Sequence, residues 1–532
     1  MSLHTLADSE SSGEEQNGEV PLGRNAVTPN SSSNCSDDDG GGYGGGGALR
    51  HEQAAADISE EGHDSPLLGA RWELLPDVCL QHVLLWLGDR DRTRASLVCR
   101  RWHRATRSPA LWRSRHFRFT GRSTNRGAAC MEQERADGYM RTLGSFLEEL
   151  EVLVVLPYRS RVSVVRRLQL TLKALFQGVC NSGARLRSLG VRNLQLHREA
   201  WTRSTRSNIV NSLAQFLGHA STHLQHLSLW GSRVTLTHGL KILRPLAHAQ
   251  QYLGGKGGGG GAGGGILSLD LEGFFASSEP VHNHPDFSLL LGHFHRLEWL
   301  SLSYSCVSDE LLQALGASQR QGDGQGGKGY RCGGRSSLKC LRLKCHNEEP
   351  HSQVVWEQAW VSLVRSCPKL CVEVDVEGIV NLDRLQRILL PKIPLVSFTM
   401  SECNFGEQDI SPKPLFRDIL PHFWSHLQVL SVEMDNCYQP VEEELLELVM
   451  MCGQLYSLSL NAYLELSFVE QLLLYCQKSS CPITNLDVKV CYLSEGDSQE
   501  EVEEGKLMEL LSYHSHFINP ELQLSVELYP IK

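Results

Sequence analysis

The sequence predicts an α/β fold in which short strands and helices alternate along most of the chain. The pattern Leu-x-x-Leu-x-Leu, with other apolar residues at some of its positions, occurs ten times after residue 145. Successive copies start 28 to 42 residues apart, with one gap of 57 residues. Each copy alternates like a strand, and stretches of helical period such as 308–315 and 442–451 lie between copies. This combination is typical of leucine-rich repeats.

The repeats predict an irregular leucine-rich-repeat solenoid over residues 145–532. The copies begin at Leu147, Leu186, Leu224, Ile266, Leu297, Leu338, Leu395, Leu427, Leu455 and Ile483. The long gap predicts a further, degenerate unit near 370–376, where apolar residues alternate. One unit cannot bury its own apolar face, so neighbouring units stack and share a core. The stacked strands should form an open concave face suited to holding another protein.

The N-terminal part has a different composition and predicts a disordered acidic tail over residues 1–70. Between residues 1 and 66 there are thirteen acidic residues and two arginines, so this segment carries a charge of −11. The whole chain carries −10, so the remaining residues are close to neutral. Runs of serine and glycine leave too few apolar residues to offset the entropy of ordering. Acidic residues follow Ser11, Ser12 and Ser36, as an acid-directed kinase would require. A merely solubilising tail is the favoured alternative.

Two glycine-rich stretches, 254–265 and 316–334, interrupt the repeats. A phosphate-binding loop would require Gly-Lys followed by Ser or Thr, whereas glycine follows Lys256. We therefore predict surface inserts, which a fold tolerates because loop closure costs little extra with length.

Cysteine usage and hydropathy concern the compartment. The seventeen cysteines are scattered, no run of eighteen apolar residues occurs, and the first residues are polar. These features predict neither a membrane span nor a secretory signal. We expect free thiols in the cytoplasm or nucleus.

Residues 71–122 predict a separate small domain of three helices, joined to the repeats by a linker over 123–144. Leu75-Pro76 starts the first helix, because proline suits the first turn. The first helix places Leu80, Val83 and Leu84 on one face; the second carries Ala95, Val98, Cys99 and Trp102; the third carries Leu111 and Trp112. Fifty residues make only a small core, so several apolar side chains should face a partner.

Three motifs in this domain resemble the F-box. They are Leu75-Pro76-x-x-Cys79-Leu80, Val98-Cys99-Arg100-Arg101-Trp102 and Leu111-Trp112. The pair Val83-Leu84 stands where the family often has Ile-Phe, a conservative difference. The resemblance implies docking onto the Skp adaptor of a Skp–cullin–F-box ubiquitin ligase and, through it, onto cullin and RING subunits. The adaptor contacts would be Leu75, Pro76, Leu80, Val83, Leu84, Val98, Cys99, Trp102, Leu111 and Trp112. Seven of them would be hot spots, as large apolar groups desolvated only in the complex, namely Leu75, Pro76, Leu80, Val98, Trp102, Leu111 and Trp112.

This resemblance implies a substrate-recognition subunit of an E3 ubiquitin ligase, with the solenoid as the substrate-binding domain. Such a subunit is not an enzyme; it brings a target protein to the ubiquitin-conjugating enzyme for ubiquitination and proteasomal degradation. The sequence identifies neither the target protein nor the residues that bind it. The alternative is a leucine-rich interaction scaffold that does not engage the ligase.

Intrinsic catalysis lacks the residues that it would need. A zinc-bound RING requires Cys-x-x-Cys pairs, and none occurs; Gly-x-Ser-x-Gly and His-Glu-x-x-His are also missing. The densest histidine group, His282, His284, His293 and His295, has no carboxylate or cysteine at suitable helical spacing, so we expect neither a metal nor a cofactor. Twelve arginines oppose four acids over 71–122, but without interleaved aromatics they predict a solvated face and no nucleic-acid binding.

Limited proteolysis checks this organisation. We expect trypsin to cut first within residues 1–66 and in the two glycine-rich stretches, because mobile exposed segments are cleaved fastest. Mass spectrometry would identify the core, and a stable core that begins in the middle of a repeat would contradict the arrangement.

Overall fold

The computed structural model describes residues 75–120, 136, 138–255, 265–317, 337–406, 410–493, 497–517 and 519–531. Trp72–Lys532 forms one compact unit. The predicted tail over 1–70, the serines Ser11, Ser12 and Ser36, and most of both glycine-rich stretches lie outside the described residues.

Four short helices open the described chain: α1 (Asp77–Leu85), α2 (Asp89–Ala95), α3 (Arg100–Ala105) and the 3-10 helix η2 (Pro109–Trp112). The helix starts where predicted, but Pro76 is its N-cap residue and directly precedes α1, whereas the sequence placed it in the first turn. Their common core consists of Leu80, Leu84, Ala95, Ala105 and Leu111. This core is small and separate from that of the sheet.

The prediction of a single second helix was wrong, because the chain forms α2 and α3 with a break between them. Val98 and Cys99 lie in the break. Cys99 has extended backbone, and its Sγ accepts a hydrogen bond of 3.5 Å from the backbone N–H of Trp102, at the start of α3. A cysteine that caps a helix in this way carries no turn signal in the sequence.

The rest of the described chain builds one parallel sheet in which each strand pairs with its neighbours in sequence. Its thirteen strands within the described residues are β1 (Ser114–Phe119), β2 (Glu149–Val154), β3 (Ser188–Arg192), β4 (His226–Ser228), β5 (Ser268–Leu271), β6 (Trp299–Ser303), β7 (Cys340–His346), β8 (Cys371–Glu377), β9 (Leu395–Asn404), β10 (Val429–Asp435), β11 (Ser457–Tyr463), β12 (Asn485–Leu493) and β13 (Gln523–Ile531). The fold class is therefore the predicted one, an α/β leucine-rich solenoid.

The ten sequence copies correspond to β2–β7 and β9–β12, and β8 confirms the degenerate unit. The sequence did not predict β1 and β13. In β1, the only two apolar residues are separated by Arg118 and preceded by Arg115 and His116, so the strand looks like part of a charged segment. Because Ser114 of β1 pairs with Glu149 of β2, the sheet begins before the predicted boundary at residue 122.

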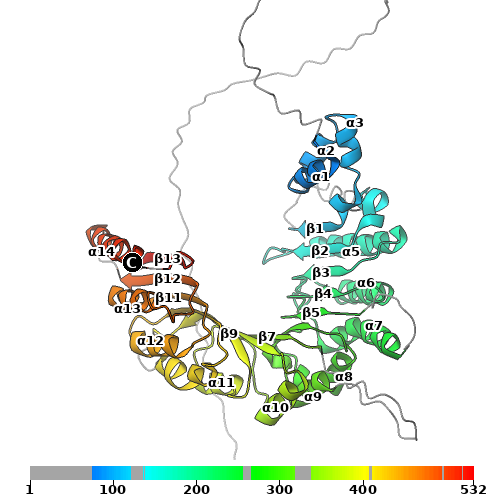
Figure 1. The fold of residues 1–532 in the computed structure, drawn as a ribbon. Helices are drawn as coiled ribbons and strands as arrows, with labels where there is room; N and C mark the ends of the chain where they lie inside the picture. The colour runs from blue at the N-terminus through cyan, green and yellow to red at the C-terminus, as the bar shows by residue number, and fades with distance from the viewer. Residues whose placement is uncertain are drawn as a thin grey trace, which may run out of the picture. The chain divides into compact units, whose positions relative to one another are not determined.

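Helices cover the convex side of the curved sheet (Figure 1). They are α5 (Val162–Ser182), α6 (Arg203–Ala220), α7 (Leu236–Gly255), α8 (Pro285–Gly292), α9 (Asp309–Gly316), α10 (Glu357–Ser366), α11 (Leu382–Ile388), α12 (Glu442–Met451), α13 (Leu466–Cys476) and α14 (Asp497–Ser515). The helices α9 and α12 confirm the two helical stretches predicted from periodicity. None of the described helices is both long enough and apolar enough to cross a membrane.

Buried leucines hold successive strands in register. One row runs from β2 to β7 and consists of Leu150, Leu189, Leu227, Leu269, Leu300 and Leu341. Each of them is almost completely buried, in a single apolar core that runs along the sheet. The strands therefore share one core, as stacked repeats require.

The turns that follow β4 and β5 are stacked as closely as the strands. Gly231 and Gly273 have φ angles of 66° and 57°, a region that favours glycine. The backbone N–H of Gly231 donates a 2.9 Å hydrogen bond to the Glu272 carbonyl. A Cβ on Gly231 would lie 3.2 Å from the Cα of Asn193 in the preceding turn. The ladder of backbone hydrogen bonds thus continues past the strand ends, where side chains would keep the turns apart.

Candidate protein-interaction surfaces

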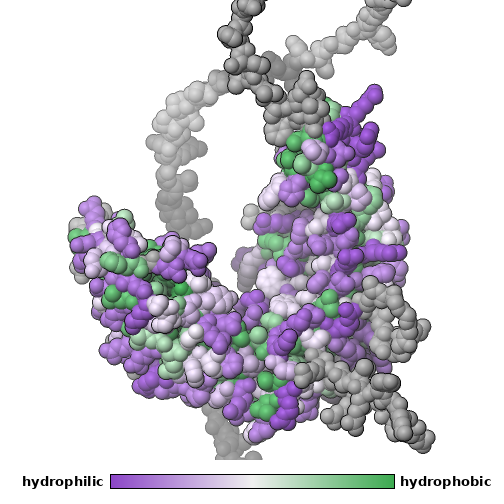
Figure 2. All heavy atoms as spheres, viewed as in Figure 1, coloured by the Kyte–Doolittle hydropathy of each residue, from purple (hydrophilic) through white to green (hydrophobic). Residues whose placement is uncertain are grey.

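Helix α1 is apolar on its solvent side as well as on its core side. Leu80 and Leu84 are buried, whereas Val78 and Trp86, the residue directly after α1, keep 78% and 83% of their surface exposed. Leu97, in the break between α2 and α3, is 81% exposed. Figure 2 shows hydrophobic residues gathered at α1. A helix that served only its own core would be polar outside, so this exposed apolar surface is suited to a partner.

Arg92 of α2 fixes the helices that carry this surface. Its Nε and Nη2 donate hydrogen bonds of 2.9 Å to the carbonyls of Leu84 and Leu85 at the end of α1. Its Nη1 donates to the carbonyl of Leu111 at 3.0 Å, and the guanidinium lies over the Trp112 ring. One side chain thus satisfies carbonyls at two helix ends, which have few partners within their own helices.

A second arginine holds the start of α1. Arg101 of α3 donates from Nε and Nη2 to the carboxylate of Asp77, at 3.0 and 2.9 Å, and from Nη2 to the carbonyl of Leu75. The arginines that looked like a solvated face in the sequence therefore include two that determine the geometry of α1.

The concave face of the sheet carries the polar side chains that alternate with the buried rows. On β7 and β8, Lys344 Nζ lies 3.0 Å from Asp375 Oδ1 and 2.6 Å from Glu377 Oε2. Burial alone would lower the pKa of Lys344, but these two carboxylates raise it. On β2 and β3, Arg192 pairs with Glu151 at 2.7 Å beside a groove of about 360 Å³. The charges on these strands are largely paired within the sheet.

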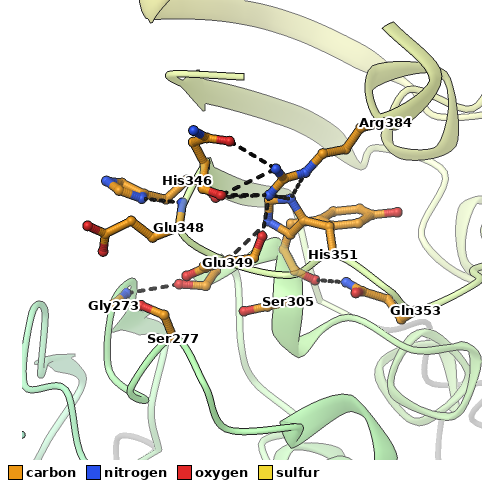
Figure 3. Close-up of polar contacts among 12 residues, drawn as sticks. Gly273, Ser277, Ser305, His346, Glu348, Glu349, His351, Gln353 and Arg384 are labelled. Carbon is orange, nitrogen blue, oxygen red and sulfur yellow. Dashed lines mark hydrogen bonds and ion pairs between the residues drawn. The ribbon is translucent and has the colours of Figure 1, made fainter. Parts of the chain in front are cut away.

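A buried polar network fixes the loop between β7 and α10 (Figure 3). Glu349 and His351 are only 4% and 3% exposed. Arg384 of α11 reaches across, donating from Nε to His351 Nδ1 at 2.8 Å and from Nη2 to the carbonyl of Glu349. Gln353 donates to the Tyr304 carbonyl at 2.7 Å. The network ties three successive repeats together at one edge of the concave face.

These contacts determine the protonation of His351. Because Nδ1 accepts from Arg384, the ring proton sits on Nε2, which donates to Glu349 Oε2 at 3.3 Å. Burial lowers the pKa of His351, and the Arg384 charge lowers it further. Burial alone would raise the pKa of Glu349, but hydrogen bonds from His351 and Ser305 hold it below its ordinary value. The network is therefore built for neutral histidine and ionised glutamate.

Two comparisons with known proteins found similarity to this chain. A family model described as F-box-like matches residues 72–118. These residues form an F-box-like domain. Over 331 residues the chain is 23% identical to F-box/LRR-repeat protein 8 of Homo sapiens, covering 62% of this chain and 74% of that protein. That name combines the two parts seen here, an F-box and leucine-rich repeats.

The structure places the ten predicted adaptor contacts in three settings. Leu80, Leu84 and Leu111 lie in the core of the F-box-like domain itself. For Leu80 and Leu111, the expectation that only a partner would desolvate them was wrong, because packing of the short helices already buries them. They support the surface from beneath.

The other predicted contacts are at least partly accessible. Leu75, Trp102 and Trp112 are half-buried, and Trp112 Nε1 donates to the Thr106 carbonyl at 2.7 Å. The exposed residues are Pro76, Val83, Val98 and Cys99. Of the ten, only these last four are exposed to a partner without a rearrangement.

Sequence reasoning missed four exposed apolar residues of the domain, namely Val78, Leu85, Trp86 and Leu97. These residues lie outside both the single helical stripe and the family motif from which the contacts were predicted. A signal was present, since α1 has apolar residues all round and so exceeds what one small core can bury.

The four histidines at 282, 284, 293 and 295 do not form a common cluster of ligands. His282 Nδ1 contacts the Ser305 carbonyl at 3.2 Å, whereas His293 Nδ1 contacts the Leu289 carbonyl at 2.7 Å. In the part of the chain that the structure describes, no three His, Cys, Asp or Glu side chains are placed to hold a metal ion.

The substitution Arg92→Ala tests the clamp on α1. We expect a loss of about 2 kcal/mol of local stability, because carbonyls of Leu84, Leu85 and Leu111 lose a charged donor. Hydrogen exchange should show faster exchange of α1 and η2 amides with the sheet unchanged. Arg94→Ala, which removes only an exposed pair with Asp91, is the control and should change little. Equal protection in both variants would contradict the role of Arg92.

The network around His351 predicts acid sensitivity. A pKa below the ordinary value means that the folded chain binds fewer protons than the unfolded chain, so stability rises with pH in that interval. For His351 the interval lies below 6.5, and for Glu349 below 4.5. We expect the urea midpoint to fall between about pH 7 and pH 5, where Glu349 stays ionised.

The variant His351→Gln separates this effect from general acid denaturation. Glutamine can accept from Arg384 and donate to Glu349 but does not titrate, so the midpoint should change less with pH. Replacement of the exposed His223 by Gln serves as control. A pH profile that is the same in wild type and His351→Gln would refute the assignment.

Proposed function

We propose that this chain is the substrate-recognition subunit of a Skp–cullin–F-box E3 ubiquitin ligase. The observation that carries the proposal is the exposed apolar surface on α1 and at Leu97, on a domain that matches the F-box-like model. Large apolar side chains that lose water only in a complex are typical binding hot spots. Under this proposal, the Skp adaptor covers that surface and connects the chain to cullin and RING subunits.

The solenoid would hold the target protein. Its concave face is a wide polar sheet without a metal cluster among the described residues. The chain would raise the effective concentration of the target near a ubiquitin-loaded enzyme and contribute no bond-making group of its own. Ubiquitination followed by proteasomal degradation, in the cytoplasm or nucleus, is the outcome that we propose.

We also propose a finer relationship, to F-box only protein 39. The segments Trp86–Arg92 and Phe119–Arg122 look like the corresponding parts of that protein. The likeness extends over about 71–532, apart from the two glycine-rich stretches.

A leucine-rich scaffold that does not engage the ligase is the second candidate. It has the same solenoid but gives no reason for the exposed Trp86. Purification of the tagged full chain from cells discriminates between the two, because a scaffold would return without adaptor and cullin.

The double variant Trp86→Ala, Leu97→Ala tests the adaptor surface. We expect binding to the Skp adaptor to weaken by about 2–4 kcal/mol, or roughly 30- to 1000-fold, because two exposed hot-spot side chains are lost. Titration calorimetry with purified adaptor measures the change. Trp424→Ala, which removes a half-exposed tryptophan near β10, is the matched control and should bind normally. Undiminished binding by the folded double variant would exclude this surface.

A further inference from the structure

The concave face changes character at β9. A groove of about 700 Å³ crosses strands β9 to β13 near their carboxyl ends. Two registered rows line it. The first is Glu433, Asn461, Lys489 and Glu527, and the second is Tyr463, Cys491 and Tyr529. Both rows run across the strands, so they follow the length of the solenoid.

The groove has an unbalanced charge, unlike the strands before it. Among the described residues that line it, Glu402, Glu433, Asp435 and Glu527 are acidic, and Lys489 is the one cation. Lys489 Nζ lies 3.9 Å from Glu527. Within the described residues, Glu402, Glu433 and Asp435 have no ion pair. On β8, by contrast, two carboxylates are paired, both of them with Lys344. Like charges on neighbouring strands destabilise a sheet, so this surplus favours a cationic partner.

The electrostatic environment of the neighbouring groups agrees with this imbalance. Burial, together with the nearby Cys437 and Asp435, raises the pKa of Tyr463 to about 12. Burial raises the pKa of Cys491, and Asp435 and Glu433 raise it further. Negative charge is therefore felt across the groove and not only at its rim.

Aromatic rings lie among the carboxylates. Tyr529 is 62% exposed, and Tyr463 lines the same row two strands away. A guanidinium group stacks on an aromatic ring and binds carboxylates in the same plane, which a compact ammonium group does less well. The combination of rings and acids therefore selects arginine.

We propose that the groove across β9–β13 binds an arginine-rich, extended segment of the target protein. The proposal deepens the proposed function and rests on it only for the partner being a ligase target. Four strand spacings of about 4.8 Å give a length of about 19 Å, which six extended residues cover. A nucleic acid would be repelled by the same charges.

The test measures binding of a fluorescein-labelled peptide of about eight residues, in which arginine alternates with alanine. The protein is the full chain, and fluorescence anisotropy is read at about 50 mM salt, because exposed charge contacts weaken with ionic strength. The variant is Glu402→Gln, Glu433→Gln, Glu527→Gln. We expect its dissociation constant to be about tenfold higher than that of the wild type.

The control removes the same charge elsewhere, by Glu443→Gln, Glu447→Gln, Glu504→Gln on exposed positions of α12 and α14. It should change the dissociation constant less than twofold. The acidic residues 1–66 are present in all three proteins, so their attraction for the peptide is the same. Equal losses in variant and control, no loss in the variant, or equal binding of a glutamate–alanine peptide would overturn the proposal. Adaptor binding, measured on the same preparations, fails or succeeds independently of this result.

Discussion

The buried row of aliphatic side chains that passes from strand to strand is the constraint on which the rest of the molecule depends. No repeat has a core of its own; Leu227 is buried because Leu189 and Leu269 flank it in register. Because successive side chains of a strand point to opposite faces of the sheet, the residues that alternate with the buried ones face the concave side. The polar surface is thus a consequence of the apolar one, and each concave position can vary without disturbing the core.

The F-box-like domain, by contrast, is not held together mainly by a large apolar core. Its core has few residues, so polar contacts supply much of the geometry. Arg92 and Arg101 position α1 from two sides through backbone carbonyls and Asp77. The domain therefore combines a small core, an outward apolar surface and arginines that hold that surface in place. The charges of Arg92 and Arg101 are therefore structural, although the sequence alone presents them as part of a solvated face.

Periodicity made most of the fold predictable because a buried row repeats its residue type. In β2–β7 and β9–β12 the row is visible as the repeated leucine pattern, and the long gap between two copies predicted β8. Strand β1 was not predicted because Arg115 and Arg118 interrupt its apolar pattern. It forms nevertheless, because it pairs with β2. The motif located the F-box-like domain, but it could not separate core from surface. Leu84 and Trp86 are equally apolar in the sequence, and only packing buries one and exposes the other. The network of Glu349, His351 and Arg384 could not be predicted, since Arg384 comes from the next repeat and its contact with the loop depends on packing.

The joint between the two parts of the chain deserves comparison with a flexible tether. Only Arg113 separates η2 from β1, and its carbonyl accepts hydrogen bonds from the N–H groups of Glu148 and Glu149, both at 2.8 Å. Tyr139 adds a hydrogen bond to the Trp112 carbonyl at 2.8 Å. The helical domain is therefore fixed to the first strand of the sheet, and the following strands lie about 4.8 Å apart. A target bound on the concave face is therefore held at a fixed distance from the helical domain. Adding or removing one repeat between them would change that distance by about one strand spacing.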